Sequence, residues 1–252
     1  MVHPSIAVLE RHLLLYRRLW RASVFSFFVL PVLFLLSVGV GVGAYVSDVD
    51  HVSYLSWIAP ALLASLAFQI GFNESTMGIY TDFEWIGAFH VMRNTRVRIR
   101  DMIAGWHLYV LVVLELAVIA FLLVTWAFGV LDLRLALAGP AVCALVALSI
   151  AAPTTAFSAI ARDENHFHLL AQFGVLPATL VSGVFFPVDR LPDLLEPLAY
   201  VSPLWHGVEL NRAVALGVTP SWPPVLHIAA LLAWTVLGLA WAHRAFRRRL
   251  AD

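Results

Sequence analysis

The sequence predicts an all-α membrane protein with six transmembrane helices. Hydrophobic residues make up 61% of the 252 residues and charged residues only 13%, which is more apolar than a soluble domain of this size. Six apolar stretches each reach the length of about 20 residues that spans the hydrocarbon core. Thirteen of the sixteen arginines gather at alternate junctions between these stretches. That bias predicts a multi-pass protein of the cytoplasmic membrane with both termini in the cytoplasm.

The first element, residues 1–22, is expected to be a helix lying in the membrane interface. Ile6, Leu9, Leu13 and Tyr16 recur at helical spacing, and charged residues, mostly arginines, occupy the other side. The N-terminal stretch lacks a small-residue cleavage site before a mature domain, so we do not expect a cleaved signal peptide.

The expected spans cover residues 24–45, 54–72, 102–128, 135–160, 169–186 and 225–241. No connection between them is long enough to fold alone, and the sequence shows no internal repeat. We therefore expect a single transmembrane domain over residues 1–252.

The inner connection after the second span, residues 73–101, is a candidate coupling segment. Its acids come early and its arginines late, which complements a helix macrodipole, while Phe83, Ile86 and Phe89 would form an apolar edge. We expect a short cytoplasmic helix that docks into a partner. The alternative is a solvated loop whose arginines bind anionic headgroups. The candidate coupling residues are Asp82, Phe83, Glu84, Trp85, Phe89 and Arg93.

The outer connection, residues 187–222, is rich in both prolines and apolar residues. Its prolines cut it into pieces too short to span a membrane. We expect short re-entrant helices in the outer leaflet, buried against protein where their backbone groups are satisfied; the alternative is a surface loop with amphipathic turns. The candidate outer-gate residues are Phe185, Phe186, Pro187, Pro203, His206 and Glu209.

Two acidic residues are candidates for an intramembrane role. Glu115 stands about 13 residues into the third span, which places it near mid-membrane at about 1.5 Å per residue. Glu74 stands at the inner end of the second span. An intramembrane carboxylate is costly and so indicates function, although Glu115 would serve equally as a protonated hydrogen-bonding residue.

The residue content excludes several classes of protein. The chain contains no lysine, which a P-loop needs for its phosphates. A single cysteine, Cys143, excludes a disulfide framework and a cysteine-based metal site. His166 and His168 lack an evident third ligand, and neither a G-x-S-x-G elbow nor an H-E-x-x-H helix is present. We therefore predict a chain that is not an enzyme, with no catalytic, cofactor or metal site.

Three stretches carry a resemblance to one family. Residues 74–78 read ESTMG, similar to the pattern E-x-T-x-G, and residues 92–101 with Gly105 are similar to M-L-A-T-P-L-S-x-R-D…G. Residues 182–217 are similar to S-G-x-F-F-P…L-P…P-L-x-H…E-L-x-R…G. The chain thus resembles the permease subunits of ABC type-2 exporters, of the nodulation-factor, polysaccharide and daunorubicin-resistance kind. It departs from the pattern at Arg96 and Trp106, where the family usually has Pro and Glu.

The resemblance implies an exporter of two permeases and two cytoplasmic ATPase subunits in a bacterial membrane. ATP and Mg²⁺ would bind the ATPase partner and not this chain, and the second permease would be a copy or a related chain. The cargo would be amphipathic, such as a drug, a lipid or a lipid-linked glycan, and a drug cargo would mean efflux and antibiotic resistance. No nucleic-acid partner is expected. The alternatives are an ion-coupled secondary transporter with Glu115 as proton relay, and an intramembrane enzyme or assembly factor.

Overall fold

The computed structural model describes residues 3–18, 20–37, 41, 48–49, 52–130 and 132–251. Its α-helices are α1 (Pro4–Tyr16), α2 (Trp20–Leu36), α3 (Tyr54–Glu84), α4 (Ala88–Arg93), α5 (Ile99–Ala127), α6 (Leu133–Ile160), α7 (Asn165–Leu170), α8 (Leu176–Val181), α9 (Glu196–Val201), α10 (Pro203–Leu216) and α11 (Pro224–Arg249). The remaining elements are a π-helical segment η2 (Ala171–Val175), a 3-10 helix η3 (Val188–Arg190), and two antiparallel strands, β1 (Asp48–Val49) and β2 (Val52–Ser53). The predominantly helical fold agrees with the predicted class.

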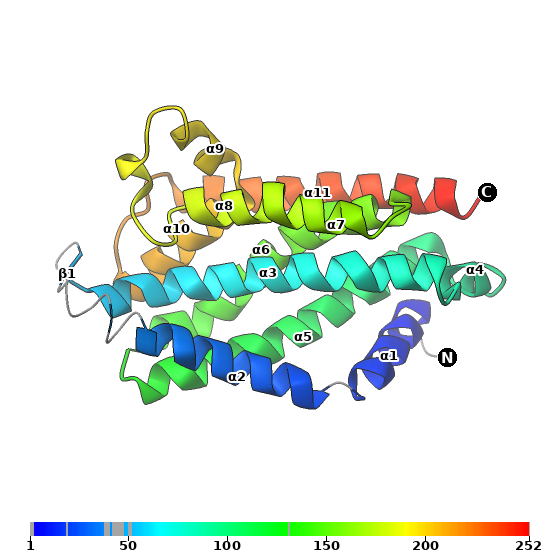
Figure 1. Cartoon of the computed structure of the whole chain (residues 1–252), viewed down its shortest axis with the longest axis horizontal. Helices are drawn as coiled ribbons and strands as arrows, with labels where there is room; N and C mark the ends of the chain where they lie inside the picture. The colour runs from blue at the N-terminus through cyan, green and yellow to red at the C-terminus, as the bar shows by residue number, and fades with distance from the viewer. Residues whose placement is uncertain are drawn as a thin grey trace.

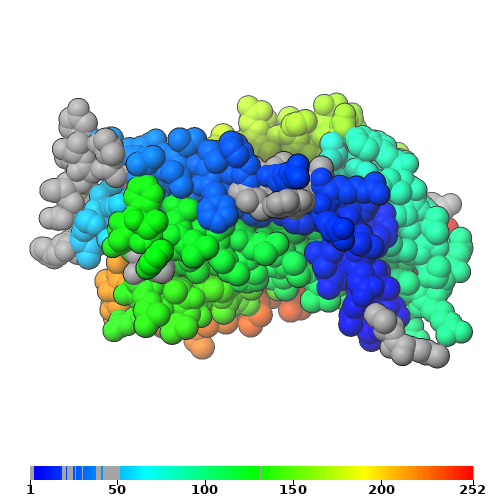
Figure 2. Space-filling view, turned by 90° about the horizontal axis from the view of Figure 1, so that it is seen from below, coloured from blue at the N-terminus to red at the C-terminus, as the bar shows by residue number. Residues whose placement is uncertain are grey.

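The long helices lie alongside one another, and the short elements gather at the two ends of the bundle (Figure 1). Both termini, α1 and α4 lie at one end, which we call the termini end. Strand β1, α9 and α10 lie at the other end, which we call the α9 end. Helix α1 crosses the direction of the long helices at the termini end (Figure 2), as expected of a helix at a membrane interface.

Four helices in the described part of the chain are long and apolar enough to cross a membrane. They are α3, α5, α6 and α11, with 31, 29, 28 and 26 residues. The fifth expected span corresponds to the 17 residues from α7 through η2 to α8, a shorter helix that ends at Val181. Helix α2 also has 17 residues, and most of residues 38–45 of the first expected span lie outside the described residues. The total of six spans stays a prediction.

Two helices extend well beyond the apolar stretches. Helix α3 continues twelve residues past residue 72, through the polar segment that was expected to start a connection, and ends at Glu84. Helix α11 continues past residue 241 to Arg249, and Arg247, Arg248 and Arg249 in its last turn complement the helix macrodipole. Both extensions project toward the termini end, so these segments are helix and not loop.

Helix α6 packs between α3 and α11, and small residues allow the close approach. A Cβ added at Gly71 of α3 would lie 2.5 Å from the carbonyl oxygen of Ala147, and one added at Gly238 of α11 would lie 2.5 Å from Cδ of Pro153. Contacts between small residues are typical of helix packing in membranes, where the surrounding lipid removes most of the hydrophobic drive.

The outer connection folds into short helices that pack against the bundle. Helix α10 begins at Pro203 and ends before Gly217, whose φ of +68° suits glycine. Arg212 of α10 donates to the backbone oxygens of Trp57 and Val184, and its guanidinium lies 3.6 Å from the centre of the Trp57 ring. These contacts satisfy backbone oxygens inside the bundle and fix α10 against α3.

Candidate functional site

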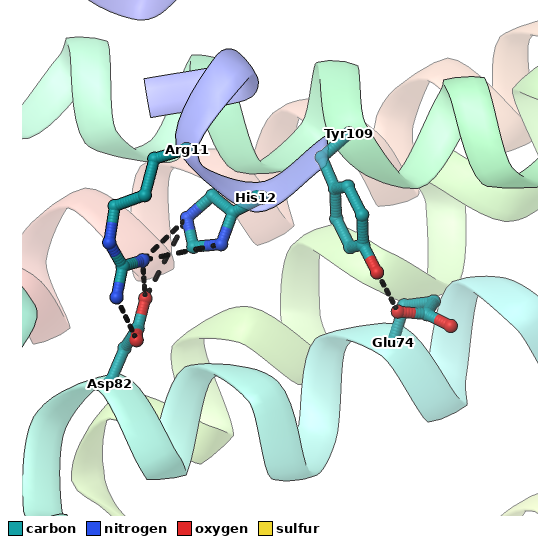
Figure 3. A network of polar contacts seen from close by, with 5 residues as sticks. All are labelled: Arg11, His12, Glu74, Asp82 and Tyr109. Atoms are coloured by element: carbon teal, nitrogen blue, oxygen red, sulfur yellow. Dashed lines mark hydrogen bonds and ion pairs between the residues drawn. The ribbon is translucent and has the colours of Figure 1, made fainter. Parts of the chain in front are cut away.

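At the termini end, an ion pair joins α1 to α3. Nη1 and Nη2 of Arg11 donate to the two carboxylate oxygens of Asp82 at 2.8 and 2.9 Å (Figure 3). The Asp82 side chain is 4% exposed and the Arg11 side chain 28%. This bidentate contact holds α1 against α3, and loss of Arg11 would leave the buried Asp82 carboxylate without compensation.

His12 lies beside the ion pair and closes the contact between α1 and α5. Its ring packs edge-on against Trp106 of α5, with the ring centres 4.5 Å apart. Burial, and after it the charge of Arg11, lowers the pKa of His12 from 6.5 to about 3. The Asp82 carboxylate lies 3.6 Å from Nε2 of His12. His12 is therefore neutral at pH 7.

A second set of contacts fixes the start of α1 to α5. Ser5 Oγ donates to Oδ1 of Asp101 at 3.3 Å, and Oδ2 of Asp101 accepts the backbone N–H of Arg98. A Cβ added at Gly105 would lie 2.6 Å from the backbone oxygen of Ser5 and 2.6 Å from Cβ of Val8. Helix α1 thus rests directly on the backbone of α5.

The motif at residues 74–78 packs α3 against α5. Tyr109 of α5 donates its hydroxyl to Oε2 of Glu74 at 2.9 Å. Gly78, one turn further along α3, lies under the Trp106 ring, since an added Cβ there would be 2.5 Å from a ring carbon. The glutamate and the glycine of the motif therefore both serve the contact between these helices.

The expectation that Phe83 and Phe89 offer an apolar edge to a partner is not met. Both side chains are buried, and their rings form a cluster with Phe246 of α11, with ring centres 4.8 to 5.1 Å apart. The edge exists, but it faces α11 of the same chain. The cluster joins α3, α4 and α11 into one packed unit.

The surface that remains open at this end lies on the turn between α3 and α4 and on α4 itself. Trp85 is 63% exposed, Ile86 56% and Val91 66%, and Arg93 is also exposed. We call these four residues the docking surface. Asp82 and Glu84, also expected to couple to a partner, are engaged within the chain, Asp82 with Arg11 and Glu84 with Arg249.

The candidate outer-gate residues lie together at the α9 end but differ in exposure. Phe186 is exposed, and Phe185 and Pro187 are half-buried. Glu209 accepts from the backbone N–H and the hydroxyl of Ser221, both at 2.8 Å.

Pro203 and His206 of the same gate are buried at the start of α10. Nδ1 of His206 lies 2.9 Å from Nδ1 of His227 of α11, so one ring donates and the other accepts. Burial, followed by the neighbouring His227, lowers the pKa of His206 to about 4.

Glu115 lies half-buried on α5. Within the described ranges, the structure gives it no hydrogen-bond partner and no cation within 4.0 Å. No group of three or more His, Cys, Asp or Glu side chains gathers as a metal site among the residues that the structure describes.

The pairing of Arg11 with Asp82 could not be found from the sequence. The two residues are 71 positions apart, and each reads as an ordinary charge on the polar face of a helix. The only local signal was the presence of small residues, Gly78 and Gly105, where α3 and α1 approach α5. The structure thus adds Arg11, His12 and Tyr109 to the residues of interest.

The chain is similar to one protein family and to several known proteins. The family described as "ABC-2 type transporter" matches residues 5–216 of the chain. Nodulation protein J of Rhizobium meliloti (strain 1021) is 26% identical over 245 residues, which cover 97% of this chain and 93% of that protein. Nodulation protein J of Rhizobium leguminosarum bv. trifolii is 27% identical over the same length and the same shares. Nodulation protein J of Azorhizobium caulinodans is 27% identical over 234 residues, covering 90% of each chain.

Proposed function

The chain belongs to the ABC-2 type transporter family, and from that premise we propose that it is the membrane subunit of an exporter driven by a separate cytoplasmic ATPase. The absence of lysine supports an outside source of energy, because a P-loop needs a lysine on the phosphates. In this proposal the termini end faces the cytoplasm, in agreement with the distribution of arginines. ATP and Mg²⁺ bind two ATPase subunits, and a second permease, a copy or a related chain, completes the complex.

The docking surface is the proposed contact with the ATPase. Exposed Trp85, Ile86 and Val91 offer apolar area, and Arg93 offers charge, which is the mixture typical of interface centres. This surface begins directly after the end of α3, 12 residues beyond the expected membrane span of that helix. A movement of the ATPase would therefore act on α3 directly.

Two packed contacts would carry that movement into the membrane. The cluster of Phe83, Phe89 and Phe246 links α4 to α11, and the pair of Arg11 and Asp82 links α3 to α1. A motor shifts a conformational equilibrium only through contacts that differ between its two states. The linkage of α1, α3, α4 and α11 is the single observation that favours this mechanism most.

The path for cargo would open at the α9 end. Phe185, Phe186 and Pro187 border the short helices there, with Pro203, His206 and Glu209 behind them. We propose an amphipathic cargo, such as a drug, a lipid or a lipid-linked glycan, because the bundle offers mainly apolar side chains. Drug efflux, and the antibiotic resistance that follows from it, would be one form of this activity.

The test of this proposal is capture of the tagged chain in mild detergent from native membranes. We expect an ATPase subunit with a P-loop to copurify, and the double substitution Trp85→Ala with Val91→Ala to lower its recovery at least about tenfold, since interface anchors cost about 2 kcal/mol or more each. The matched control is Leu194→Ala, an apolar residue 85% exposed at the α9 end, which should change nothing. Unchanged recovery after the double substitution would refute the docking surface.

Phe89→Ala separates folding from docking in the same assay. Because Phe89 is fully buried, its truncation should lower the free energy of unfolding by about 3–5 kcal/mol. Trp85→Ala, on an exposed side chain, should stay within about 0.5 kcal/mol of the original chain. Loss of ATPase recovery with intact stability therefore identifies a contact residue.

A further inference from the structure

A cavity of about 530 Å³ lies between the segment from α7 through η2 to α8 and the helices α3, α6 and α11. Its volume falls within the range of about 300–1,000 Å³ that is typical of sites for drug-sized molecules. Helix α9 and Pro203, at the start of α10, border it toward the α9 end. Pro203 is the one outer-gate candidate in its lining.

The cavity exists because the segment from α7 to α8 stands off the bundle along its middle. Phe167 of α7 packs against Tyr80 of α3, with ring centres 5.4 Å apart, and Ser182 after α8 shares a hydrogen bond of 2.7 Å with Ser202. Between these two attachments, η2 and α8 contain no buried residue. Inside a membrane, acyl chains fill such a space unless another molecule has a higher affinity for it.

Six aromatic side chains line the cavity, and all of them lie in expected membrane spans. They are Phe68, Phe72, Phe157, Phe173, Trp234 and Trp241. In the part of the chain that the structure describes, Phe157 is the one member of this set with an aromatic neighbour, and that neighbour is Phe167, outside the lining. The other five rings contact no aromatic ring there, so a bound molecule can pack against them.

The lining contains no charged side chain. Its hydroxyl groups are those of Thr154 and Ser202, and Ser202 is already bonded to Ser182. A charged molecule would therefore lose its hydration here without gaining a partner.

The aromatic lining also discriminates between uncharged molecules. An acyl chain gains little in the cavity that the surrounding lipid does not already provide, because lipid tails are as apolar as the side chains of the lining. An aromatic molecule gains ring contacts in edge-to-face or offset geometry, and each contact changes an affinity about two- to tenfold. The lining therefore favours an aromatic molecule over an aliphatic one of the same size.

We propose that this cavity binds uncharged aromatic compounds that reach it from the bilayer. The binding requires neither the ATPase nor ATP. That the aromatic part of the cargo occupies the cavity during transport rests on the exporter function proposed above.

Photolabelling with benzophenone tests the site directly, because this uncharged two-ring ketone bonds to nearby C–H groups when it is illuminated. The full chain is reconstituted in lipid nanodiscs without nucleotide, and the adducts are mapped by mass spectrometry. We expect adducts on peptides of α6, of the segment from η2 to α8, and of α11. Diphenylmethane should compete with the label. Dicyclohexylmethane, which has the same skeleton without aromatic rings, should need at least about a tenfold higher fraction of the bilayer to do so.

Removal of exposed rings from the lining should weaken the labelling while the fold stays intact. Phe173→Leu combined with Trp241→Leu keeps apolar side chains at two positions that are 72% and 42% exposed, and it should lower the labelling of α6 at least about fivefold. The matched control is Phe25→Leu combined with Trp126→Leu. These side chains are 65% and 69% exposed and lie outside the cavity, so the labelling should stay within about twofold.

Three results would overturn the proposal. Equal competition by the two hydrocarbons would show that any apolar molecule enters the cavity. Adducts spread evenly over all lipid-exposed helices, or unchanged labelling in the cavity variant, would show that the aromatic lining binds nothing. None of these results concerns the capture of an ATPase subunit, so the failure of this proposal and the failure of the proposed function are distinguishable.

Discussion

Removal of Arg11 should detach α1 from the bundle more than removal of Asp82. Arg11→Ala leaves the Asp82 carboxylate, 4% exposed, without its two hydrogen bonds of 2.8 and 2.9 Å. Loss of one partner of a buried ion pair costs about 3–5 kcal/mol. Asp82→Ala leaves the Arg11 guanidinium without its partner instead. Because Arg11 is 28% exposed and reaches water, loss of Asp82 should cost only about 1–2 kcal/mol.

Hydrogen exchange of the peptide that covers α1 measures this difference. The opening equilibrium of α1 should rise roughly a hundredfold or more in Arg11→Ala and about 5- to 30-fold in Asp82→Ala. Arg17→Ala, an exposed arginine at the end of the same helix, is the matched control and should leave the equilibrium within about twofold. The reasoning is refuted if Asp82→Ala opens α1 as much as Arg11→Ala, or if neither exceeds the control.

Three other outcomes follow from the same structure. Burial lowers the pKa of His12 from 6.5 to about 3, so between these pH values His12 binds a proton when α1 is detached but not when α1 is packed. The free energy that holds α1 against the bundle should therefore fall by up to about 1.4 kcal/mol per pH unit as the pH falls from 6.5 toward 3. Hydrogen exchange of α1 should lose this pH dependence in His12→Phe. Gly105→Ala places a Cβ 2.6 Å from α1 backbone and should cost about 1–3 kcal/mol in thermal unfolding, more than Gly139→Ala, whose nearest neighbour is a flexible side chain at 3.1 Å. Glu115→Gln should leave ATP-driven transport unchanged; transport that needs a proton gradient and is lost in this variant would favour the secondary transporter instead.

Length and composition were sufficient to predict the helical membrane class, and four of the expected spans coincide with helices of the described chain that are long and apolar enough to cross a membrane. Stretches of about 20 apolar residues have few alternatives in a chain of this kind, because every backbone polar group in lipid must be bonded within the protein. The prolines of residues 187–222 likewise predicted the short helices, since each proline removes a backbone donor and ends or begins a helix.

The contacts at the termini end were beyond prediction for a different reason. Residues 73–84 mix polar and apolar side chains, so the stretch gave no sign that α3 would continue to Glu84. An apolar edge on a short helix indicates that the edge is buried, but it does not identify the residues that pack against it. Phe83 and Phe89 pack against Phe246 of the same chain. Tertiary pairing over long separations leaves no mark in a single sequence.

Labelling with a photoreactive ATP analogue tests the central claim most directly. The tagged chain is purified in mild detergent with whatever remains bound, and the analogue is added with Mg²⁺ and activated by light. The account predicts label on a copurifying cytoplasmic subunit, competed by ATP, and none on this chain. Label that ATP competes from this chain itself, or ATP hydrolysis by the chain in the absence of any other subunit, would contradict it.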